Sequence, residues 1–249
     1  MLEIEIVPCL TDNYAYLVKA GEVCAVVDPS EPGPVRAALA RRGWHLSHIL
    51  NTHHHLDHTG GNLALKQAYG AKVVGPAKDA ARIPGLDIGL DETGWSFGGL
   101  AVQVLEVPGH TRGAISFVMA GNAFTGDTLF AMGCGRLFEG DPAMMWASLS
   151  KLMRLPDETR IWCGHEYTNA NGRFALTLEP DNRALAARMD EVAALRRAGR
   201  PTLPSTMALE KTTNPFLRPD SPAIRQTLGM KDADTVAVFA EIRRRKDRF

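Results

Sequence analysis

The chain lacks an excess of charge of either sign. Among its 249 residues, Lys plus Arg number 28 and Asp plus Glu also number 28. Such a balance produces no long-range field toward nucleic acid or an anionic membrane surface. We therefore expect neither as a partner, and any anion must be bound by a local cluster of cations.

The chain also lacks long apolar runs and closely spaced cysteines. No apolar run approaches membrane-spanning length, and residues 1–6 carry acidic side chains where a signal peptide would carry basic ones. The cysteines are scattered, with no Cys-x-x-Cys pair, at positions Cys9, Cys24, Cys134 and Cys163. We predict a cytoplasmic protein whose cysteines remain reduced thiols in a core.

What the chain does have is a stretch dense in metal-binding side chains, Thr-His-His-His-Leu-Asp-His at 52–58. Apolar or neutral residues at 49–52 predict a short strand before it, and the spacing at 62–69 predicts a helix after it. In an extended segment alternate side chains point the same way, so His53 and His55 can reach one ion, whereas His54 points elsewhere. Asp57 and His58 follow the bend. Because catalytic zinc usually takes three protein ligands, these residues are better divided between two adjacent ions.

Three more candidate ligands each follow a predicted strand. His110 follows 101–107, Asp127 follows 122–125 and His165 follows 160–163. We expect two ligand groups that share Asp127, namely His53, His55 and His110 for one ion and Asp57, His58 and His165 for the other. Imidazole and carboxylate donors without a thiolate suit zinc, iron or manganese. Two such cations polarise a carbonyl and lower the pKa of a bound water, so the site predicts hydrolysis without a nucleophilic side chain.

The order of the predicted elements indicates an α/β protein with two domains. Residues 1–168 alternate strands with helices, and the helix between the strands at 49–52 and 71–75 predicts a parallel pairing. From 169 to 249 the strand pattern ends, and helices are predicted at 173–178, 182–198, 222–228 and 234–248. Two segments show no regular pattern: 76–99, and a loop of about 20 residues after 198 that we expect to wrap over the first domain.

Four of these motifs resemble the metallo-β-lactamase superfamily. They are Thr-His-x-His-x-Asp-His at 52–58, Pro-Gly-His-Thr at 108–111, Gly-Asp-Thr at 126–128 and Gly-His-Glu-Tyr at 164–167. Within that superfamily the chain resembles the hydroxyacylglutathione hydrolase (glyoxalase II) family. This second resemblance rests on Asp-Asn-Tyr at 12–14, Gly-Cys-Gly-Arg at 133–136, Thr-Asn-Pro-Phe-Leu-Arg at 213–218 and Arg-Lys-Asp-Arg-Phe at 245–249.

The resemblance implies a four-layer αβ/βα sandwich followed by a small all-α domain that binds substrate. It implies a monomer that binds two divalent ions, of which zinc is the expected metal. The expected reaction is hydrolysis of S-D-lactoylglutathione to D-lactate and glutathione, the second step of methylglyoxal detoxification. By the same analogy Asp57 orients the attacking hydroxide, and glutathione is held by Arg136, Tyr167, Arg243 and Lys246. Many family members have Lys and Tyr where this chain has Arg136 and Phe138, so one substrate hydrogen bond is absent here.

Two alternatives stay open at this point. Some relatives with this fold hold a single iron and oxidise glutathione persulfide, but Asp57, His58 and His165 would complete a second site. A metal-binding interaction module without catalysis would leave the cationic carboxyl-terminal helix unexplained. Among the other histidines, His54 either supports the ligands or faces solvent, and His45 and His48 have no ligand partner in sequence.

Overall fold

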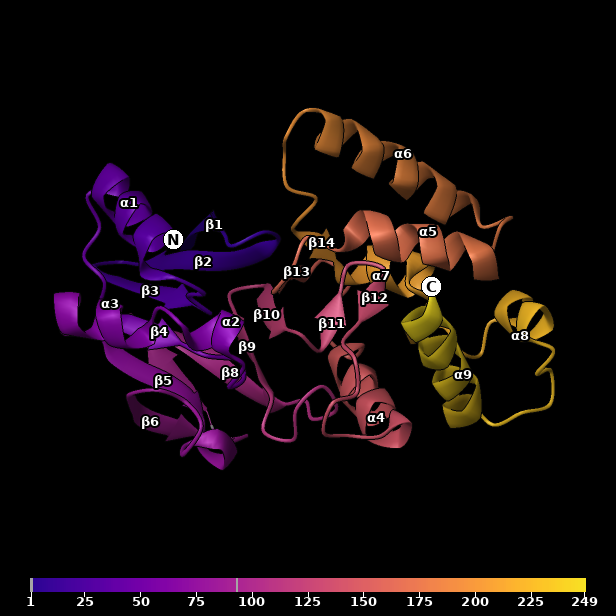
Figure 1. Cartoon of the computed structure of the whole chain (residues 1–249), viewed down its shortest axis with the longest axis horizontal. Helices are drawn as coiled ribbons and strands as arrows, with labels where there is room; N and C mark the ends of the chain where they lie inside the picture. The colour runs from indigo at the N-terminus through magenta and orange to yellow at the C-terminus, as the bar shows by residue number, and fades with distance from the viewer. Residues whose placement is uncertain (1, 93) are drawn as a thin grey trace. The chain divides into compact units, whose positions relative to one another are not determined.

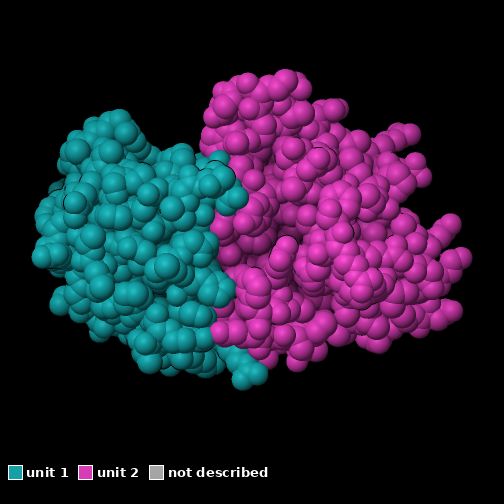
Figure 2. Space-filling model, in the orientation of Figure 1, with its two compact units in different colours: residues 1–106, 112–126 teal, residues 107–111, 127–249 magenta. Residues whose placement is uncertain are grey.

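The computed structural model describes residues 2–92 and 94–249. The chain forms two compact units, which Figure 2 colours separately. Unit 1 is Met1–Glu106 with Arg112–Gly126, and unit 2 is Val107–Thr111 with Asp127–Phe249. The candidate ligands are therefore divided, with those of the histidine-rich stretch in unit 1 and the other three in unit 2.

Unit 1 is an α/β unit built on two series of strands (Figure 1). Its elements are β1 (Leu2–Cys9), β2 (Asn13–Ala20), β3 (Val23–Val27), α1 (Pro32–Arg42), β4 (His48–Leu50), α2 (Leu56–Thr59), α3 (Asn62–Tyr69), β5 (Lys72–Pro76), the 3-10 helix η1 (Ala77–Asp79), β6 (Leu86–Leu90), β7 (Trp95–Phe97), β8 (Leu100–Glu106), β9 (Ile115–Met119) and β10 (Asn122–Gly126).

The first sheet has the order β1-β2-β3-β4-β5-β6. Its first three strands are antiparallel and joined by tight turns, whereas β3 to β6 pair in parallel. Parallel neighbours need a crossover, which α1 and α3 provide. Both helices pack on one face of the sheet, where Val35, Leu39 and Leu65 join a core of strand residues. The carboxyl end of β4, a largely buried strand, thus leads into the histidine-rich stretch.

The other face of this sheet packs against the second series, β10-β9-β8-β7, which is antiparallel. The Tyr16 ring on β2 lies 5.6 Å from the Phe124 ring on β10, and the His48 ring on β4 lies 5.6 Å from the Phe97 ring on β7, measured between centroids. Two sheets packed face to face, with helices outside the first, are the αβ half of a layered sandwich.

Unit 2 is mostly helical (Figure 1). Its elements are β11 (Leu129–Phe130), β12 (Gly133–Cys134), α4 (Pro142–Leu152), β13 (Arg160–Cys163), α5 (Thr168–Leu178), α6 (Arg183–Arg197), β14 (Ser205–Thr206), α7 (Met207–Thr213), the 3-10 helix η2 (Pro215–Leu217), α8 (Pro222–Leu228) and α9 (Thr235–Arg248).

Local sequence signals explain the helices of unit 2. Asp141, Asn182 and Asp234 each cap a helix, because their side chains accept a hydrogen bond from a backbone N–H of the first turn. The aromatic rings of Trp146 on α4 and Phe239 on α9 lie 6.0 Å apart, which joins these helices. In the part of the chain that the structure describes, no helix is both long and apolar enough to cross a membrane.

The sequence predicted most of these elements and missed others. The helix at 62–69 and the parallel pairing of β4 with β5 are confirmed. The less regular connection predicted at 76–99 contains two short strands that the sequence did not reveal, β6 and β7. The loop predicted after 198 contains three short elements that were also missed, β14, α7 and η2. Each of these elements is too short to show a readable periodicity. The strand β14 pairs with β13, which belongs to the predicted first domain.

Candidate metal site

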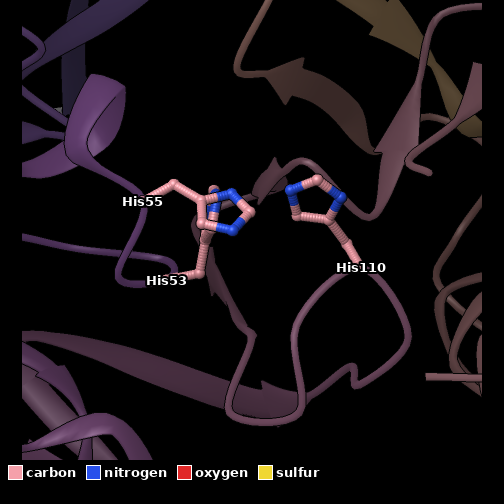
Figure 3. A group of neighbouring side chains, drawn as sticks. All are labelled: His53, His55 and His110. Carbon is pink, nitrogen blue, oxygen red and sulfur yellow. The ribbon is translucent and has the colours of Figure 1, made fainter. Parts of the chain in front are cut away.

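The histidine-rich stretch turns sharply after β4, because the short helix α2 begins at Leu56. Before the turn, His53 Nε2 faces His55 Nδ1 at 3.2 Å (Figure 3). Two nitrogens bound to one tetrahedral zinc, each at roughly 2.0–2.1 Å, lie about 3.3 Å apart. The observed separation of the two nitrogens is therefore the one that a shared ion requires.

A buried carboxylate, Asp28, supports this stretch from the end of β3. Its two oxygens accept hydrogen bonds from the backbone N–H of Thr52 at 2.8 Å and from the Thr52 hydroxyl at 2.6 Å, and one of them lies 3.1 Å from His58 Nδ1. The contact between Asp28 and His58 directs the Nδ1 proton of His58 toward Asp28 and leaves Nε2 as the ligand atom. Sequence reasoning missed Asp28, although its position directly after a strand that neighbours β4 was the available signal.

Asp57 is oriented by Asn13, the first residue of β2. The side-chain amide of Asn13 donates to Asp57 Oδ2 at 3.1 Å and to the Asp57 carbonyl at 3.1 Å. The same Oδ2 lies 3.6 Å from His58 Nε2. The asparagine of the Asp-Asn-Tyr motif at 12–14 thus has a structural role, because it orients the side chain of a candidate ligand.

In unit 2, Asp127 lies between the other two histidines. Its Oδ2 is 3.5 Å from His110 Nε2 and 3.3 Å from His165 Nε2. These separations are long for hydrogen bonds but suit oxygen and nitrogen atoms that bind one ion, about 3.3–3.5 Å. His110 Nδ1 faces the carbonyl of Arg136 at 2.9 Å, which leaves Nε2 for a metal. A single carboxylate oxygen therefore faces the ligand atoms of both predicted groups.

Three groups of described residues each bring one potential ligand atom per residue within 4.8 Å of the others. The groups are His53, His55 and His110 (Figure 3); Asp57, His58 and His165; and Asp28, His53 and His58. The first two are the groups expected from the sequence. The third is better explained as support, because the Asp28 oxygens already serve Thr52 and His58.

The remaining histidines do not join these groups. His54 Nδ1 lies 3.1 Å from Asp79 Oδ2, and its Nε2 lies 3.2 Å from an Arg82 nitrogen, so it is held by an ion-pair network rather than simply exposed. The His45 ring packs edge-on against Tyr69. Burial between aromatic rings lowers the pKa of His48.

The four residues expected to hold glutathione differ in exposure. Arg136 is largely exposed, and Tyr167 is partly exposed with its ring stacked on His165 at 4.7 Å. Arg243 is buried, where it donates 2.8 Å hydrogen bonds to the Cys134 carbonyl and to Asp247. Lys246 Nζ lies over Phe174 and Phe249, and its pKa is lowered, first by burial and then by the charges of Arg243, Arg173 and Arg136. The sequence did not single out Arg173.

Comparison with known proteins defines the class of this fold and site. Residues 10–165 match the model of the metallo-beta-lactamase superfamily, and the chain belongs to that superfamily. ETHE1 from Myxococcus xanthus has a similar structure, with a TM-score of 0.70 and 24% identity over 97% of this chain and 90% of its own. TTHA1623, crystallised in a di-iron-bound form, has a TM-score of 0.63 and 29% identity over 86% of this chain and 100% of its own.

Sequence relatives narrow the class further. Residues 166–249 match the model "Hydroxyacylglutathione hydrolase C-terminus". The hydroxyacylglutathione hydrolases of Methylococcus capsulatus and Cereibacter sphaeroides are 55% and 57% identical, each over 100% of this chain and 99% of its own length. The chain belongs to the hydroxyacylglutathione hydrolase family, which confirms the resemblance and the metallo-β-lactamase fold followed by a helical region.

Proposed function

We propose that this protein hydrolyses the thioester of S-D-lactoylglutathione and related 2-hydroxyacylglutathiones, releasing the hydroxy acid and glutathione. The observation that carries the proposal is identity of 53–57% over the full length with hydroxyacylglutathione hydrolases. The reaction would be the second step of methylglyoxal detoxification. Because a thiolate is a good leaving group, the site needs no dedicated general acid.

The donor set fits two divalent cations. His53, His55 and His110 would hold one, Asp57, His58 and His165 the other, and Asp127 would be shared, which its Oδ2 distances of 3.5 and 3.3 Å to two imidazoles support. When bound, such a pair polarises the thioester carbonyl and supplies a nucleophilic water at neutral pH. Zinc is the proposed metal, with iron or manganese compatible with the same donors.

The chain's own groups orient these ligands and the substrate. Asn13 fixes the Asp57 carboxylate, which is proposed to orient the attacking oxygen. Asp28 and the Arg136 carbonyl fix the rings of His58 and His110. These contacts are formed before the substrate arrives, so little reorganisation remains for the reaction itself.

Arg136, Tyr167, Arg243 and Lys246 are the proposed glutathione-binding residues. Their grouping supports this role, because the pKa of Lys246 is lowered first by burial and then by the charges of three neighbouring arginines, and such a cluster of cations favours an anion. Arg243 already donates hydrogen bonds to the Cys134 carbonyl and to Asp247. Its proposed role is therefore to add positive charge to the cluster and to position the residues beside it. Lys246 and Arg136 are the better exposed cations for direct contact.

The domain boundary, oligomeric state and location are also proposals. A catalytic domain at 1–168 and a helical substrate-binding domain at 169–249 is supported by two family models that meet at residues 165 and 166. A cytoplasmic location is supported by the free, buried state of all four cysteines, which suits a reducing compartment. We also propose a monomer.

The test is hydrolysis of S-D-lactoylglutathione by protein purified with zinc. We expect loss of the thioester absorbance with release of one thiol per turnover. A second sample loaded with iron and given glutathione persulfide should consume no oxygen. Oxygen consumption without thioester hydrolysis would replace the proposal by a persulfide-oxidising activity, and inactivity in both assays would favour a non-catalytic metal-binding protein.

A further inference from the structure

The hairpin of β11 and β12 joins two parts of the candidate site. Asp127 lies two residues before β11, and Arg136, whose carbonyl faces His110 Nδ1, lies two residues after β12. The strands pair through Leu129 with Cys134 and Phe130 with Gly133, which leaves only two residues for the turn. The hairpin is so short that its tip lies only four or five residues from Asp127, roughly 13–17 Å along the chain at about 3.3 Å per residue.

The turn is not of the kind that favours a hairpin. Met132, its second central residue, has a φ of +54°, whereas the preferred two-residue turns place a positive φ at the first central residue. A positive φ is also uncommon for a side chain such as methionine. The turn therefore needs contacts from outside the hairpin to keep its shape.

Buried side chains from α5 and from the segment α7–η2 provide those contacts. Glu210 accepts a 2.8 Å hydrogen bond from the Met132 N–H. The Asn214 amide donates to the carbonyls of Phe130, at 3.2 Å, and Gly133, at 3.0 Å, and it also contacts Glu210 at 2.9 Å. The Asn171 amide donates to the Ala131 carbonyl at 3.1 Å.

We propose that Glu210, Asn214 and Asn171 form a hairpin clamp, a set of positioning residues that fixes the β11–β12 turn and thereby the Asp127 and His110 ligand atoms. The proposal rests on the function proposed above. It also gives a role to the Asn-Pro-Phe segment at 214–216, to which metal and substrate binding assign none. Asn214 is fully buried, and its Oδ1 accepts from the Phe216 N–H, so one side chain both starts η2 and holds the turn.

The clamp needs donors and acceptors rather than a charge. Glu210 contacts the turn through Oε2, an acceptor, and its Oε1 meets the Ser205 hydroxyl, which can donate or accept. Glutamine supplies the same acceptor. Burial also raises the pKa of Glu210, which favours the uncharged carboxyl group that glutamine resembles. Asn214→Asp is the opposite case, because it keeps Oδ1 for Phe216 but points an oxygen at two carbonyls and a carboxylate.

The test compares zinc-loaded Asn214→Asp, Glu210→Gln and wild type. Asn214→Asp should release zinc to a chromophoric chelator about tenfold faster or more, as expected when groups behind metal ligands are lost. Its kcat at saturating zinc should fall about tenfold to a hundredfold with little change in KM, and hydrogen exchange should increase in residues 128–136. Glu210→Gln should behave like wild type in all three measurements.

The matched control is Asn122→Asp. Asn122 also donates from a largely buried amide to a carbonyl of a hairpin turn, that of Ala120 at 2.8 Å, at the opposite end of β10 from Gly126. The control should lower Tm without changing zinc release or kcat. Equal zinc release from both aspartate variants would overturn the clamp, even if no substrate is found. If Asn214→Asp does not fold, Asn171→Ala must release zinc faster than the control, and equality would again refute the proposal.

Discussion

Lys246 offers the sharpest test of how substrate is held. Its Nζ lies 5.6 Å from the centre of the Phe174 ring and 5.2 Å from that of Phe249, in a half-buried position beside Arg136, Arg173 and Arg243. Replacing it by glutamine removes a charge and leaves a polar side chain of similar length. A charge-assisted hydrogen bond contributes roughly 1.5–3 kcal/mol, or about 10- to 150-fold in affinity. Because the site is only half buried, we expect the lower end, about tenfold.

The effect should fall on KM. Lys246 is proposed to bind glutathione carboxylate equally in the ground state and the transition state, so its loss removes uniform binding and leaves kcat unchanged. High salt should raise KM for wild type and matter less for Lys246→Gln. The assay is steady-state hydrolysis of S-D-lactoylglutathione at low and high ionic strength.

A pH dependence follows from the same surroundings. Burial and three neighbouring arginines lower the pKa of Lys246, so its positive charge is lost at a lower pH than that of an ordinary lysine. The KM of wild type should therefore begin to rise below the usual lysine range, whereas Lys246→Gln should lack this rise.

Arg244→Gln is the control for net charge, since Arg244 lies on the same helix, is half exposed and pairs with Glu241. The reasoning would be refuted if Arg244→Gln raised KM as much as Lys246→Gln, or if Lys246→Gln lowered kcat and left KM alone.

Three further predictions are independent of this one. Asp127→Ala should lose metal and nearly all turnover while the far-ultraviolet spectrum persists; retention of two ions with normal kcat would remove Asp127 as the shared ligand. Phe138→Tyr should lower KM severalfold by adding a hydroxyl to an exposed ring beside His110, and an unchanged KM would separate this ring from the substrate. Asp141→Ala should cost about 1 kcal/mol of unfolding free energy, measured by denaturant, because it removes the cap of α4 but leaves the site intact.

The sequence predicted the ligand groups because their chemistry is local. His53 and His55 alternate on an extended segment, and His110, Asp127 and His165 each lie within four residues after the end of a strand, so spacing and strand ends were enough to propose them together. The helix over 62–69 was equally accessible from its period.

What the sequence could not predict depends on contacts between distant segments. Asp28 reaches His58 across 30 positions, and Glu210 reaches Met132 across 78. Nothing in the local pattern of α7 distinguishes a buried carboxylate from an exposed one. Arg243 was expected to face substrate because it lies near Lys246 on a cationic helix, yet the structure buries it against Cys134. Helical periodicity gives the face of a side chain but not its partner.

The central claim is that this chain is a thioester hydrolase working with two metal ions. The most direct measurement is the rate of S-D-lactoylglutathione hydrolysis as zinc is titrated into metal-free protein. The account predicts that the rate rises to a plateau at about two equivalents per chain, since both ligand groups and their shared Asp127 must be filled. A plateau at one equivalent, or no hydrolysis at any zinc concentration, would contradict it.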